Sequence, residues 1–461
     1  MSINMKEAMN TEQKYITQND RLKCTKGGES LPLAPAGKPS SATPSPRGSA
    51  PKTPKRTSKT KRNYEELKSF IPQNGNEENY ALLSHYLMMD KGEAKSKKRS
   101  ELEKQFGFTP ENLNDAEKFF STKNITFRHK EKPTFTFIDL FAGIGGFRLA
   151  MQANGGECVF SSEWDDAAKQ TYYENYGEVP FGDITKDETK ALIPEHFDVL
   201  CAGFPCQPFS NAGLKKGIED TRGTLFYHIA EILETRKPKA VFLENVRGLI
   251  SNDKGRTFQT ILRTITNMGY CCNISHDKLE TYSLSKLKNE ATKMVLYAKD
   301  YGVPQNRPRI YIVLWKNDFN LAEFQYPSPL NKKTSVGTIL EKNVSEEFTI
   351  SDKLWQGHQR RRIENAQKGN GFGYCIFNET SPYTSTISRR YYKDGSEILI
   401  EQIGKNPRKL TPREAANLQG FPRNFKLPSS NTKAYQQFGN SVAVPVVQLI
   451  SEQIVKQILE K

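Results

Sequence analysis

Apolar and polar positions alternate in a regular way from residue 131 onward. Five short apolar runs have the composition of buried strands, namely 135–141, 157–161, 197–202, 240–243 and 309–315. Four stretches between them show the apolar spacing of helices, namely 147–154, 165–176, 224–236 and 256–268. Strands that alternate with helices of roughly 10–15 residues form βαβ units. The pattern therefore predicts an α/β fold with a largely parallel, doubly wound sheet.

The rest of the chain divides into parts with different patterns. Residues 1–62 are rich in Pro, Ser, Thr, Gly and Lys, which predicts a disordered basic tail. Residues 63–130 have helical spacing, with Thr109 as a helix cap before Pro110, and predict a helical extension. Residues 328–405 break the alternation of the domain 131–327 and predict a separate lobe. Residues 406–461 become helical and amphipathic again, so we expect them to return to that domain.

The charge is unevenly distributed along the chain. The net charge is +15, of which residues 1–62 carry +9, with 13 Lys/Arg against 4 Asp/Glu. Residues 353–413 hold 12 Lys/Arg against 5 Asp/Glu. In that region arginines stand next to aromatic residues, as in 389–393, which suits contacts to phosphates and base edges. Nucleic acid is therefore the favoured partner, although the basic tail is equally compatible with a solvated surface.

Several protein classes do not fit the composition. No apolar run reaches the roughly 18 residues of a membrane span, and the N-terminus lacks the pattern of a secretory signal. The seven cysteines form no C-x-x-C pair, which argues against a disulfide framework and against a structural zinc site. We therefore expect a cytoplasmic protein without a metal centre.

A glycine-rich turn follows the first predicted strand, in the segment Asp139–Phe147. Glu163 and Asp183 stand at the ends of the next two units, where doubly wound folds bind a ribose. The G-x-G-x-x-G pattern of dinucleotide enzymes is absent, and Trp164 is available to contact an adenine. A nucleoside ligand without a pyrophosphate, such as S-adenosylmethionine, is favoured over NAD. A tight turn that binds no ligand is the alternative.

A cysteine between two prolines follows a later strand. Cys206 lies between Pro205 and Pro208, after the predicted strand 197–202. Prolines stiffen the loop, and a thiol is a strong nucleophile once its pKa is lowered. The ordinary interpretation of a cysteine is a buried structural residue. That interpretation suits the cysteines in or beside apolar runs, which are Cys158, Cys201, Cys271 and Cys272.

Charged residues stand at two further strand ends. Glu244 follows the apolar run 240–243 and is a candidate acid with a raised pKa, or simply a helix N-terminal acid. Arg307 and Arg309 stand two residues apart at the start of a strand. Such a pair points to one face and can hold an anion or a base carbonyl, or it can form a surface salt bridge.

The order and spacing of these motifs resemble the cytosine-C5 DNA methyltransferases, especially the bacterial enzymes of type II restriction–modification systems. The resemblance covers roughly 135–325 and 408–461, and includes Pro205-Cys206-Gln207, Glu244-Asn245-Val246 and the closing Phe438-Gly-Asn-Ser441-Val. It implies an S-adenosylmethionine-dependent methyltransferase domain and a target-recognition lobe at 328–405. It also implies a cofactor site formed by Phe141, Gly143, Gly145, Glu163, Trp164, Asp183, Ile184, Leu225, Asn440 and Ser441.

The resemblance also implies a mechanism. The thiolate of Cys206 would add to C6 of a cytosine that has been flipped out of the duplex, and C5 would thereby become nucleophilic. Glu244 would stabilise the adduct at N3. Arg309 would hold O2 and orient Glu244, while Arg307 would assist the thiolate and the backbone.

The lobe is expected to read DNA. Thr386-Ile387 matches the short Thr-Leu signature of the family with a conservative change. The expected DNA-binding residues are Thr386, Arg389, Arg390, Tyr391 and Lys393. The lobe resembles those of enzymes that act on CCGG- or CCNGG-type sites. The resemblance thus implies double-stranded DNA as the substrate and a restriction endonuclease of the same specificity as the functional partner. It also implies that the protein acts as a monomer.

Three alternatives and two departures from the family pattern remain. A tRNA cytosine-5 methyltransferase shares the catalytic motifs but has a smaller lobe, and a DNA-binding regulator could keep the framework without activity. A nicotinamide oxidoreductase fits least, because the glycine pattern differs.

Residues 274–294 form an insertion without an assigned role. The N-terminal extension is absent from the shortest members and shows no clear helix-turn-helix motif.

Overall fold

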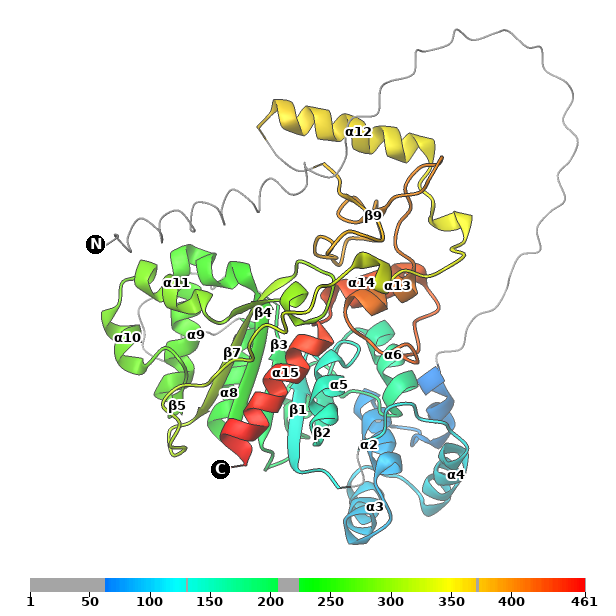
Figure 1. The fold of residues 1–461 in the computed structure, drawn as a ribbon. Helices are drawn as coiled ribbons and strands as arrows, with labels where there is room; N and C mark the ends of the chain where they lie inside the picture. Colours follow the sequence, from blue (N-terminus) through cyan, green and yellow to red (C-terminus); the bar gives the residue numbers. More distant parts are fainter. Residues whose placement is uncertain (1–62, 130–131, 206–223, 370–372, 461) are drawn as a thin grey trace, which may run out of the picture.

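A computed structural model describes residues 63–129, 132–205, 224–369 and 373–460 (Figure 1). Its centre is a seven-stranded sheet in the order β2-β1-β3-β4-β7-β5, with β6 paired to β7. The strands are β1 (Phe135–Leu140), β2 (Gly156–Ser162), β3 (Val199–Gly203), β4 (Ala240–Val246), β5 (Tyr270–Cys271), β6 (Val295–Tyr297) and β7 (Pro308–Lys316). All five predicted strands are present, so the predicted α/β fold is confirmed.

The sheet is mixed rather than largely parallel. Strands β1 to β4 pair in parallel, but β7 runs antiparallel to β4, β5 and β6. Only a short connection is available after β6, and the turn from β6 into β7 is the 3-10 helix η4 (Ala298–Tyr301) and the residues after it. A parallel strand needs a crossover of about a dozen residues or more, so this connection returns the chain in the opposite direction.

Helices cover both faces of the sheet, and the four predicted helices are all present. They are α5 (Gly146–Ala153), α6 (Asp166–Tyr176), α8 (Leu225–Arg236) and α9 (Arg256–Asn267), with the short α7 (Asp187–Lys190) after α6. Alternate residues of the strands enter two separate cores. Leu200 and Leu243 pack with α8 and α9, whereas Val199 and Phe242 pack with α5. This alternation is what a sheet covered on both faces requires.

The insertion 274–294 folds as two short helices on the edge of the domain. They are α10 (His276–Thr281) and α11 (Leu284–Thr292). Both contact α9, and α11 also contacts η3 (Arg247–Gly255), the segment that follows β4. Leu279 and Leu287 are buried in the same core as α9. The insertion therefore enlarges one core of the catalytic domain.

The N-terminal extension is helical, as predicted, and packs against the catalytic domain. It consists of η1 (Asn63–Phe70), α2 (Glu77–Met88), α3 (Glu93–Gln105) and α4 (Pro110–Ser121). The Thr109 hydroxyl accepts a hydrogen bond from the amide of Asn112 at 3.2 Å, which confirms the predicted cap of α4. Leu82 and Leu83 of α2 are buried in the core that contains Phe181. The extension therefore shares a core with the sheet domain.

The predicted lobe contains little regular structure and lies above the sheet in Figure 1. Its elements are η5 (Val336–Thr338), η6 (Glu346–Phe348), α12 (Asp352–Gln367), β8 (Ile376–Phe377) and β9 (Leu399–Ile400). Strands β8 and β9 pair in parallel. Ile387 and Ile398 are buried together with Leu410 and Phe438 of the C-terminal segment. The lobe is therefore attached through a shared apolar core.

The C-terminal segment returns to the sheet domain as expected. It forms α13 (Pro412–Leu418), α14 (Asn431–Asn440), α15 (Val444–Ile454) and the π-helical η7 (Val455–Leu459). One stretch, Asn431–Leu459, is long and apolar enough to cross a membrane by composition alone. It is interrupted between α14 and α15, and Val446, Val447 and Ile450 of α15 are fully buried with α5. That packing is typical of a core helix.

Candidate active site

The predicted motifs meet at one edge of the sheet, where β1 to β4 end at their carboxyl termini. The glycine turn follows β1, Glu163 follows β2, and Phe204 and Pro205 follow β3. Phe181 forms a parallel bridge with Ser162, which places the segment before Asp183 beside the end of β2. Glu244 lies inside β4 rather than after it, because that strand continues to Val246. Open α/β sheets bind ligands at this edge.

The glycine turn has a left-handed backbone at three positions. Phe141, Gly143 and Gly145 have φ values of 58°, 57° and 81°. A Cβ on Gly145 would clash with the ring of Tyr176, so glycine is required there. A left-handed backbone at a residue with a side chain, as at Phe141, is strained and is concentrated at functional sites. The turn thus brings the backbone close to the edge of the sheet.

Glu163 ties this turn to the end of β2. Its Oε2 accepts a hydrogen bond from the amide of Gly143 at 2.8 Å. Its Oε1 accepts from the amides of Trp164 and Asp165, both at 2.8 Å. Burial raises the pKa of Glu163, and these backbone donors act in the opposite direction. Oε1 thus accepts two hydrogen bonds and Oε2 accepts one, so the second lone pair of Oε2 can still accept from a ribose hydroxyl.

The other predicted cofactor residues on this side differ in exposure. The side chain of Trp164 is 75% exposed, so its ring is open to a stacking partner. Asp183 is half-buried, and its Oδ1 accepts from the amide of Thr185 at 2.9 Å. Ile184 is buried. Asp139, which begins the glycine-rich segment, is fully buried within β1, and burial raises its pKa to about 8. Glu163 and Asp183 are therefore the acids that follow the strands at this edge.

Residues from the far end of the chain complete this side of the edge. Ser441 caps the end of α14, and a Cβ on Gly146 would lie 2.9 Å from its Oγ. Ser441 therefore lies directly against the start of α5. Asn440 is exposed beside it, and Leu225 is half-buried at the first position of α8. The fold therefore places Ser441 beside the end of the glycine turn.

Glu244 and Arg309 form a buried ion pair on adjacent antiparallel strands. Arg309 Nε lies 3.0 Å from Glu244 Oε1, and their side chains are 13% and 11% exposed. Burial raises the pKa of Glu244, while Arg309 and Arg307 counteract this rise. Gly203 stands opposite Glu244 in the parallel register of β3 and β4. The carboxyl group therefore faces the strand end that leads to Pro205.

Asn245 has a role that its motif did not reveal. Its Nδ2 donates to the carbonyl of Phe204 at 2.9 Å, and its Oδ1 accepts from the amide of Val246 at 2.8 Å. Asn245 thereby holds the segment that precedes Cys206 against β4. Cys206 and the following residues to 223 lie outside the described residues.

The other predicted structural cysteines have the surroundings expected of inert thiols. Cys158, Cys201 and Cys272 are buried and Cys271 is half-buried, and all four are free thiols. Burial raises the pKa of Cys158 and of Cys272 to about 12. A thiol with so high a pKa is a poor nucleophile near neutral pH.

Arg307 has different partners from Arg309. It is fully buried and donates to the carbonyl oxygens of Ile387 at 3.1 Å, Gly439 at 3.2 Å and Ser441 at 2.6 Å. These contacts join the start of β7 to the lobe and to the end of α14. The interpretation as a surface salt-bridge pair is wrong for both arginines, because neither is exposed.

The expected DNA-binding residues of the lobe do not all face solvent. Arg389, Arg390 and Lys393 are exposed, and the hydroxyl of Thr386 donates to the carbonyl of Asn306 at 2.7 Å. Tyr391 contradicts the expectation, since its side chain is fully buried. Its hydroxyl donates to the carbonyl of Ile398 and accepts from the amide of Leu410, both at 2.7 Å. Tyr391 therefore joins the lobe to the C-terminal segment and contributes to the shared core.

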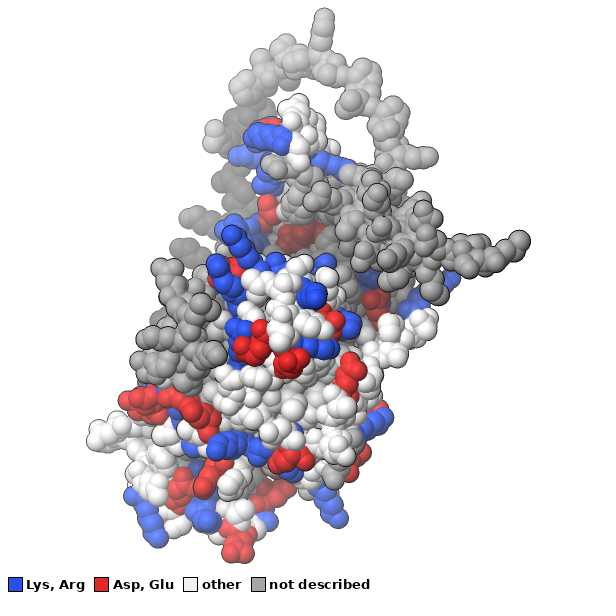
Figure 2. All heavy atoms as spheres, turned by 90° about the vertical axis from the view of Figure 1, so that its left-hand side faces the viewer, with Lys and Arg blue, Asp and Glu red and all other residues white. Residues whose placement is uncertain are grey.

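Basic side chains gather on the lobe. Figure 2 shows Lys and Arg over the upper part of one face, at the height of α12 in Figure 1. Arg360 of α12 is 75% exposed, and Arg361 pairs with Asp394 at 3.1 Å. Among the described residues, no cluster of His, Cys, Asp and Glu could hold a metal ion. The charge of the lobe thus suits a polyanion.

Known proteins resemble this chain over most of its length. A family model for C-5 cytosine-specific DNA methylases matches residues 135–456. The type II methyltransferase M.NlaX of Neisseria lactamica is 55% identical over 323 residues, which cover 69% of this chain and 96% of the relative. M.SsoII of Shigella sonnei, also a type II methyltransferase, is 54% identical over 71% of this chain and 82% of its own.

Solved structures share the fold. The crystal structure of S. pombe Dnmt2 methyltransferase superimposes with a TM-score of 0.53 and 17% identity, over 70% of this chain and 98% of that one. The structure of the Entamoeba histolytica methyltransferase EhMeth gives a TM-score of 0.52 and 19% identity over 70% of this chain and 98% of that one. At this level of identity the likeness concerns the fold alone.

Proposed function

Because this chain belongs to the C-5 cytosine-specific DNA methylase family, we propose that it transfers a methyl group from S-adenosylmethionine to C5 of a flipped-out cytosine in a short duplex sequence. The enzyme class, a type II DNA (cytosine-5-)-methyltransferase, follows from the family. The observation that carries the mechanism is the buried Glu244–Arg309 pair, which lies beside the strand that leads into Pro205-Cys206.

The residues at the sheet edge fit the adenosine of S-adenosylmethionine. Trp164 offers an open ring, Glu163 and Asp183 offer carboxylate acceptors, and Gly143 lets the backbone approach closely. The cofactor supplies an electrophilic methyl group when it is bound. The remaining proposed contacts are Phe141, Gly145, Ile184, Leu225, Asn440 and Ser441.

The thiol of Cys206 is proposed as the nucleophile. C5 of cytosine is too electron-poor to accept a methyl group directly, so a thiolate first adds to C6 and turns the ring into an enamine. C6 cannot be reached inside a stacked duplex, and the target base therefore has to leave the helix.

Glu244 and Arg309 hold the pyrimidine during this addition. The raised pKa of Glu244 favours a proton shared with N3, and Arg309 both orients Glu244 and donates to O2. We assign Arg307 to the backbone around the site, because its hydrogen bonds go to three carbonyl groups there.

The lobe 328–405 is proposed to read the target sequence, with Arg389, Arg390, Lys393 and Thr386 at the DNA. The proposed target is a CCGG- or CCNGG-type site. The proposed functional partner is an endonuclease of the same specificity. We propose that the enzyme acts as a monomer in the cytoplasm, where bacterial DNA is located. A tRNA substrate is the competing proposal, and the experiment below includes it.

Methylation and covalent trapping test this proposal together. The protein is incubated with S-adenosylmethionine and either plasmid DNA or tRNA, and the methylated cytosines are located by sequencing. We expect methylation of DNA at one short recurrent site. A duplex with 5-fluorocytosine at that site should remain covalently bound to the protein, because the C5 fluorine cannot be removed as a proton can.

The variant Cys206→Ser should lose activity by a factor on the order of 10³ or more, because the thiolate has been removed, and should still bind the cofactor. Cys271→Ser is the matched control and should retain full activity. Normal turnover of Cys206→Ser, or methylation of tRNA alone, would contradict the proposal.

A further inference from the structure

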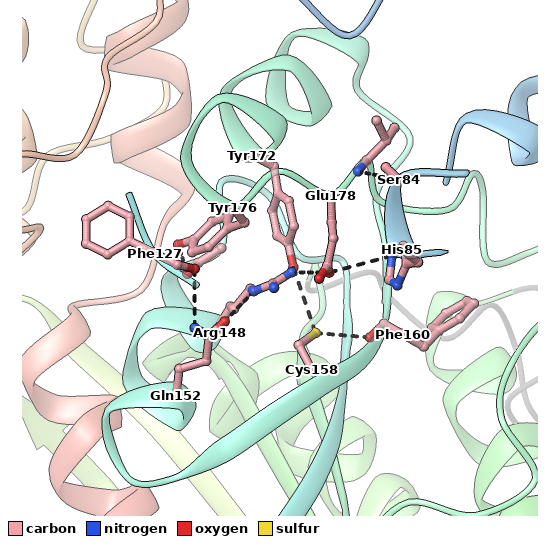
Figure 3. A network of polar contacts seen from close by, with 12 residues as sticks. Ser84, His85, Phe127, Arg148, Gln152, Cys158, Phe160, Tyr172, Tyr176 and Glu178 are labelled. Atoms are coloured by element: carbon pink, nitrogen blue, oxygen red, sulfur yellow. Dashed lines mark hydrogen bonds and ion pairs between the residues drawn. The ribbon is translucent and has the colours of Figure 1, made fainter. Parts of the chain in front are cut away.

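Helix α2 of the N-terminal extension runs along the segment 178–182, which leads to Asp183. The hydroxyl of Ser84 accepts a hydrogen bond from the amide of Val179 at 2.8 Å. His85 Nε2 lies 3.8 Å from Glu178 Oε2, and the His85 ring packs on Phe181 with a centroid distance of 5.0 Å. Figure 3 shows Ser84 and His85 facing this segment. The extension therefore holds the beginning of the segment.

Glu78 of α2 holds the other end of the same segment. Its Oε2 lies 3.0 Å from the amide nitrogen of Gly182, which donates to the carboxylate, and its Oε1 accepts from the hydroxyl of Thr189 at 2.5 Å. A Cβ on Gly182 would lie 2.7 Å from Glu78 Oε1, so a side chain there would displace the carboxylate. Gly182 directly precedes Asp183, a proposed acceptor of the cofactor. Glu78 thus fixes the backbone next to that acceptor.

A second chain of contacts leads from α2 to the glycine turn. Glu178 pairs with Arg148 at 2.5 Å, and both side chains are buried (Figure 3). The Arg148 guanidinium lies 4.7 Å from the centre of the Tyr176 ring, whose hydroxyl donates to the carbonyl of Gly145 at 2.7 Å. The extension is therefore connected to both backbone segments that form the adenosine site.

We propose that the extension 63–129 is a positioning module for the cofactor site and that Glu78 is its positioning residue. The inference rests on the proposed function, since it assumes that Asp183 and the glycine turn bind S-adenosylmethionine. The family match begins at residue 135, so the module lies outside the matched region. A charge-assisted hydrogen bond that orders Gly182 in advance spares the cofactor that ordering cost, and so increases its affinity.

The test uses the full-length protein with Glu78→Ala. We expect the KM and Kd for S-adenosylmethionine to rise about tenfold, as for loss of one hydrogen bond to a charged group. The kcat at saturating cofactor and the KM for DNA should stay within about twofold of the wild-type values, because Glu78 contacts neither DNA nor the reacting atoms. Glu78→Gln keeps an acceptor oxygen for Gly182 and should restore most of the affinity.

Glu77→Ala is the matched control. Glu77 stands next to Glu78 on α2 and pairs with Lys169 of α6 instead of the segment 178–182. Its removal weakens docking of the extension without releasing Gly182, so the KM for the cofactor should stay close to the wild-type value. Should Glu78→Ala fail to fold, Ser84→Ala replaces it and should raise the same KM by a smaller factor.

Asp183→Ala separates this inference from the proposed function. If Asp183→Ala weakens cofactor binding while Glu78→Ala does not, the positioning role is overturned and the site stands. If neither variant changes the Kd, the cofactor site itself is misplaced. A third outcome is that Glu78→Ala and Glu77→Ala lower kcat and the affinity for DNA by equal factors. That result would show that both residues only stabilise the docked extension, and it would overturn the inference.

Discussion

Two buried carboxyl groups at the sheet edge differ in what faces them. Glu244 has Arg309 at 3.0 Å, which offsets part of the cost of burying its charge. Asp139 is fully buried near Arg148, but that guanidinium is already paired with Glu178. Burial therefore dominates at Asp139 and raises its pKa to about 8. The same chemical group thus has different surroundings, with an arginine partner at Glu244 and a site dominated by burial at Asp139.

Asp139→Asn should remove a pH dependence of stability. The pKa of Asp139 is about 8 in the folded protein against 3.8 as its ordinary value, so the folded state binds the extra proton between these pH values. The contribution of Asp139 to the free energy of unfolding is therefore fully present below about pH 4. It declines as the pH rises toward 8, by at most about 1.4 kcal/mol per pH unit.

Urea unfolding at pH 5.5 and 7.5 measures this slope. The free energy of unfolding of the wild type should fall by about 2 kcal/mol more than that of Asp139→Asn over this interval. Equal slopes in the two proteins would show that Asp139 is already ionised in the folded state.

At the scale of secondary-structure elements, short polar motifs fix where helices begin. Thr109 caps α4, and Thr411 caps α13 with Glu414 as the partner of a complete capping box. The Thr411 hydroxyl accepts from the amide of Glu414 at 3.1 Å, and Glu414 Oε2 accepts from the amide of Thr411 at 2.8 Å. Arg408 then binds both oxygens of Glu414. The cap therefore also anchors the return of the chain from the lobe.

Thr411→Ala should lower the stability by about 1–2 kcal/mol, because an amide at the start of α13 loses its acceptor. Thr411→Ser retains the hydroxyl and should remain within about 0.5 kcal/mol of the wild type. Chemical denaturation of both variants at one pH gives the comparison. Equal losses in the two variants would attribute the effect to the missing methyl group.

The lobe and the sheet domain are joined through backbone carbonyl groups of distant segments. Arg307 donates to Ile387 in the lobe and to Gly439 and Ser441 at the end of α14. Gly439 permits the close approach of the lobe to α14, because a Cβ there would clash with the backbone of Ser388. The junction thus depends on the planar guanidinium of Arg307 and on the small size of Gly439, which come from separate segments of the chain.

Arg307→Lys should loosen this junction while it keeps the positive charge. A lysine ammonium cannot reproduce the fork of donors, so buried carbonyls lose their partners at a cost of roughly 2–4 kcal/mol. We expect a raised KM for DNA and faster proteolysis within 328–405. Arg413→Lys is the matched control, since Arg413 also donates to carbonyl groups, those of Pro422 and Phe425, away from the junction. Equal effects of both substitutions would argue against a special junction.

Spacing and periodicity were sufficient for the core of the fold and for the edge that carries the site. The five strands and four helices of the alternating region were predicted to within a few residues, and the glycine turn, Glu163 and Glu244 meet where parallel strands end. These features depend on local patterns, because the side-chain period and the strand–helix order are properties of neighbouring residues.

The sequence could not predict which of two faces a polar residue occupies. Tyr391 stands among exposed basic residues yet points into the core, and the charged residue Asp139 is buried within the first predicted strand. Both outcomes depend on residues that are distant in sequence, namely Leu410 for Tyr391 and the strand neighbours Ser161 and Cys201 for Asp139.

Local order along the chain was thus enough for the class of fold and for the edge that carries the candidate site, and the order of the motifs was enough for the family. Only the folded chain decided the antiparallel direction of β7, the partners of Arg307 and the docking of α2 on the segment before Asp183. Each of these joins surfaces that are distant in sequence. Hydrogen bonds and burial between such surfaces depend on three-dimensional complementarity, which no local period encodes.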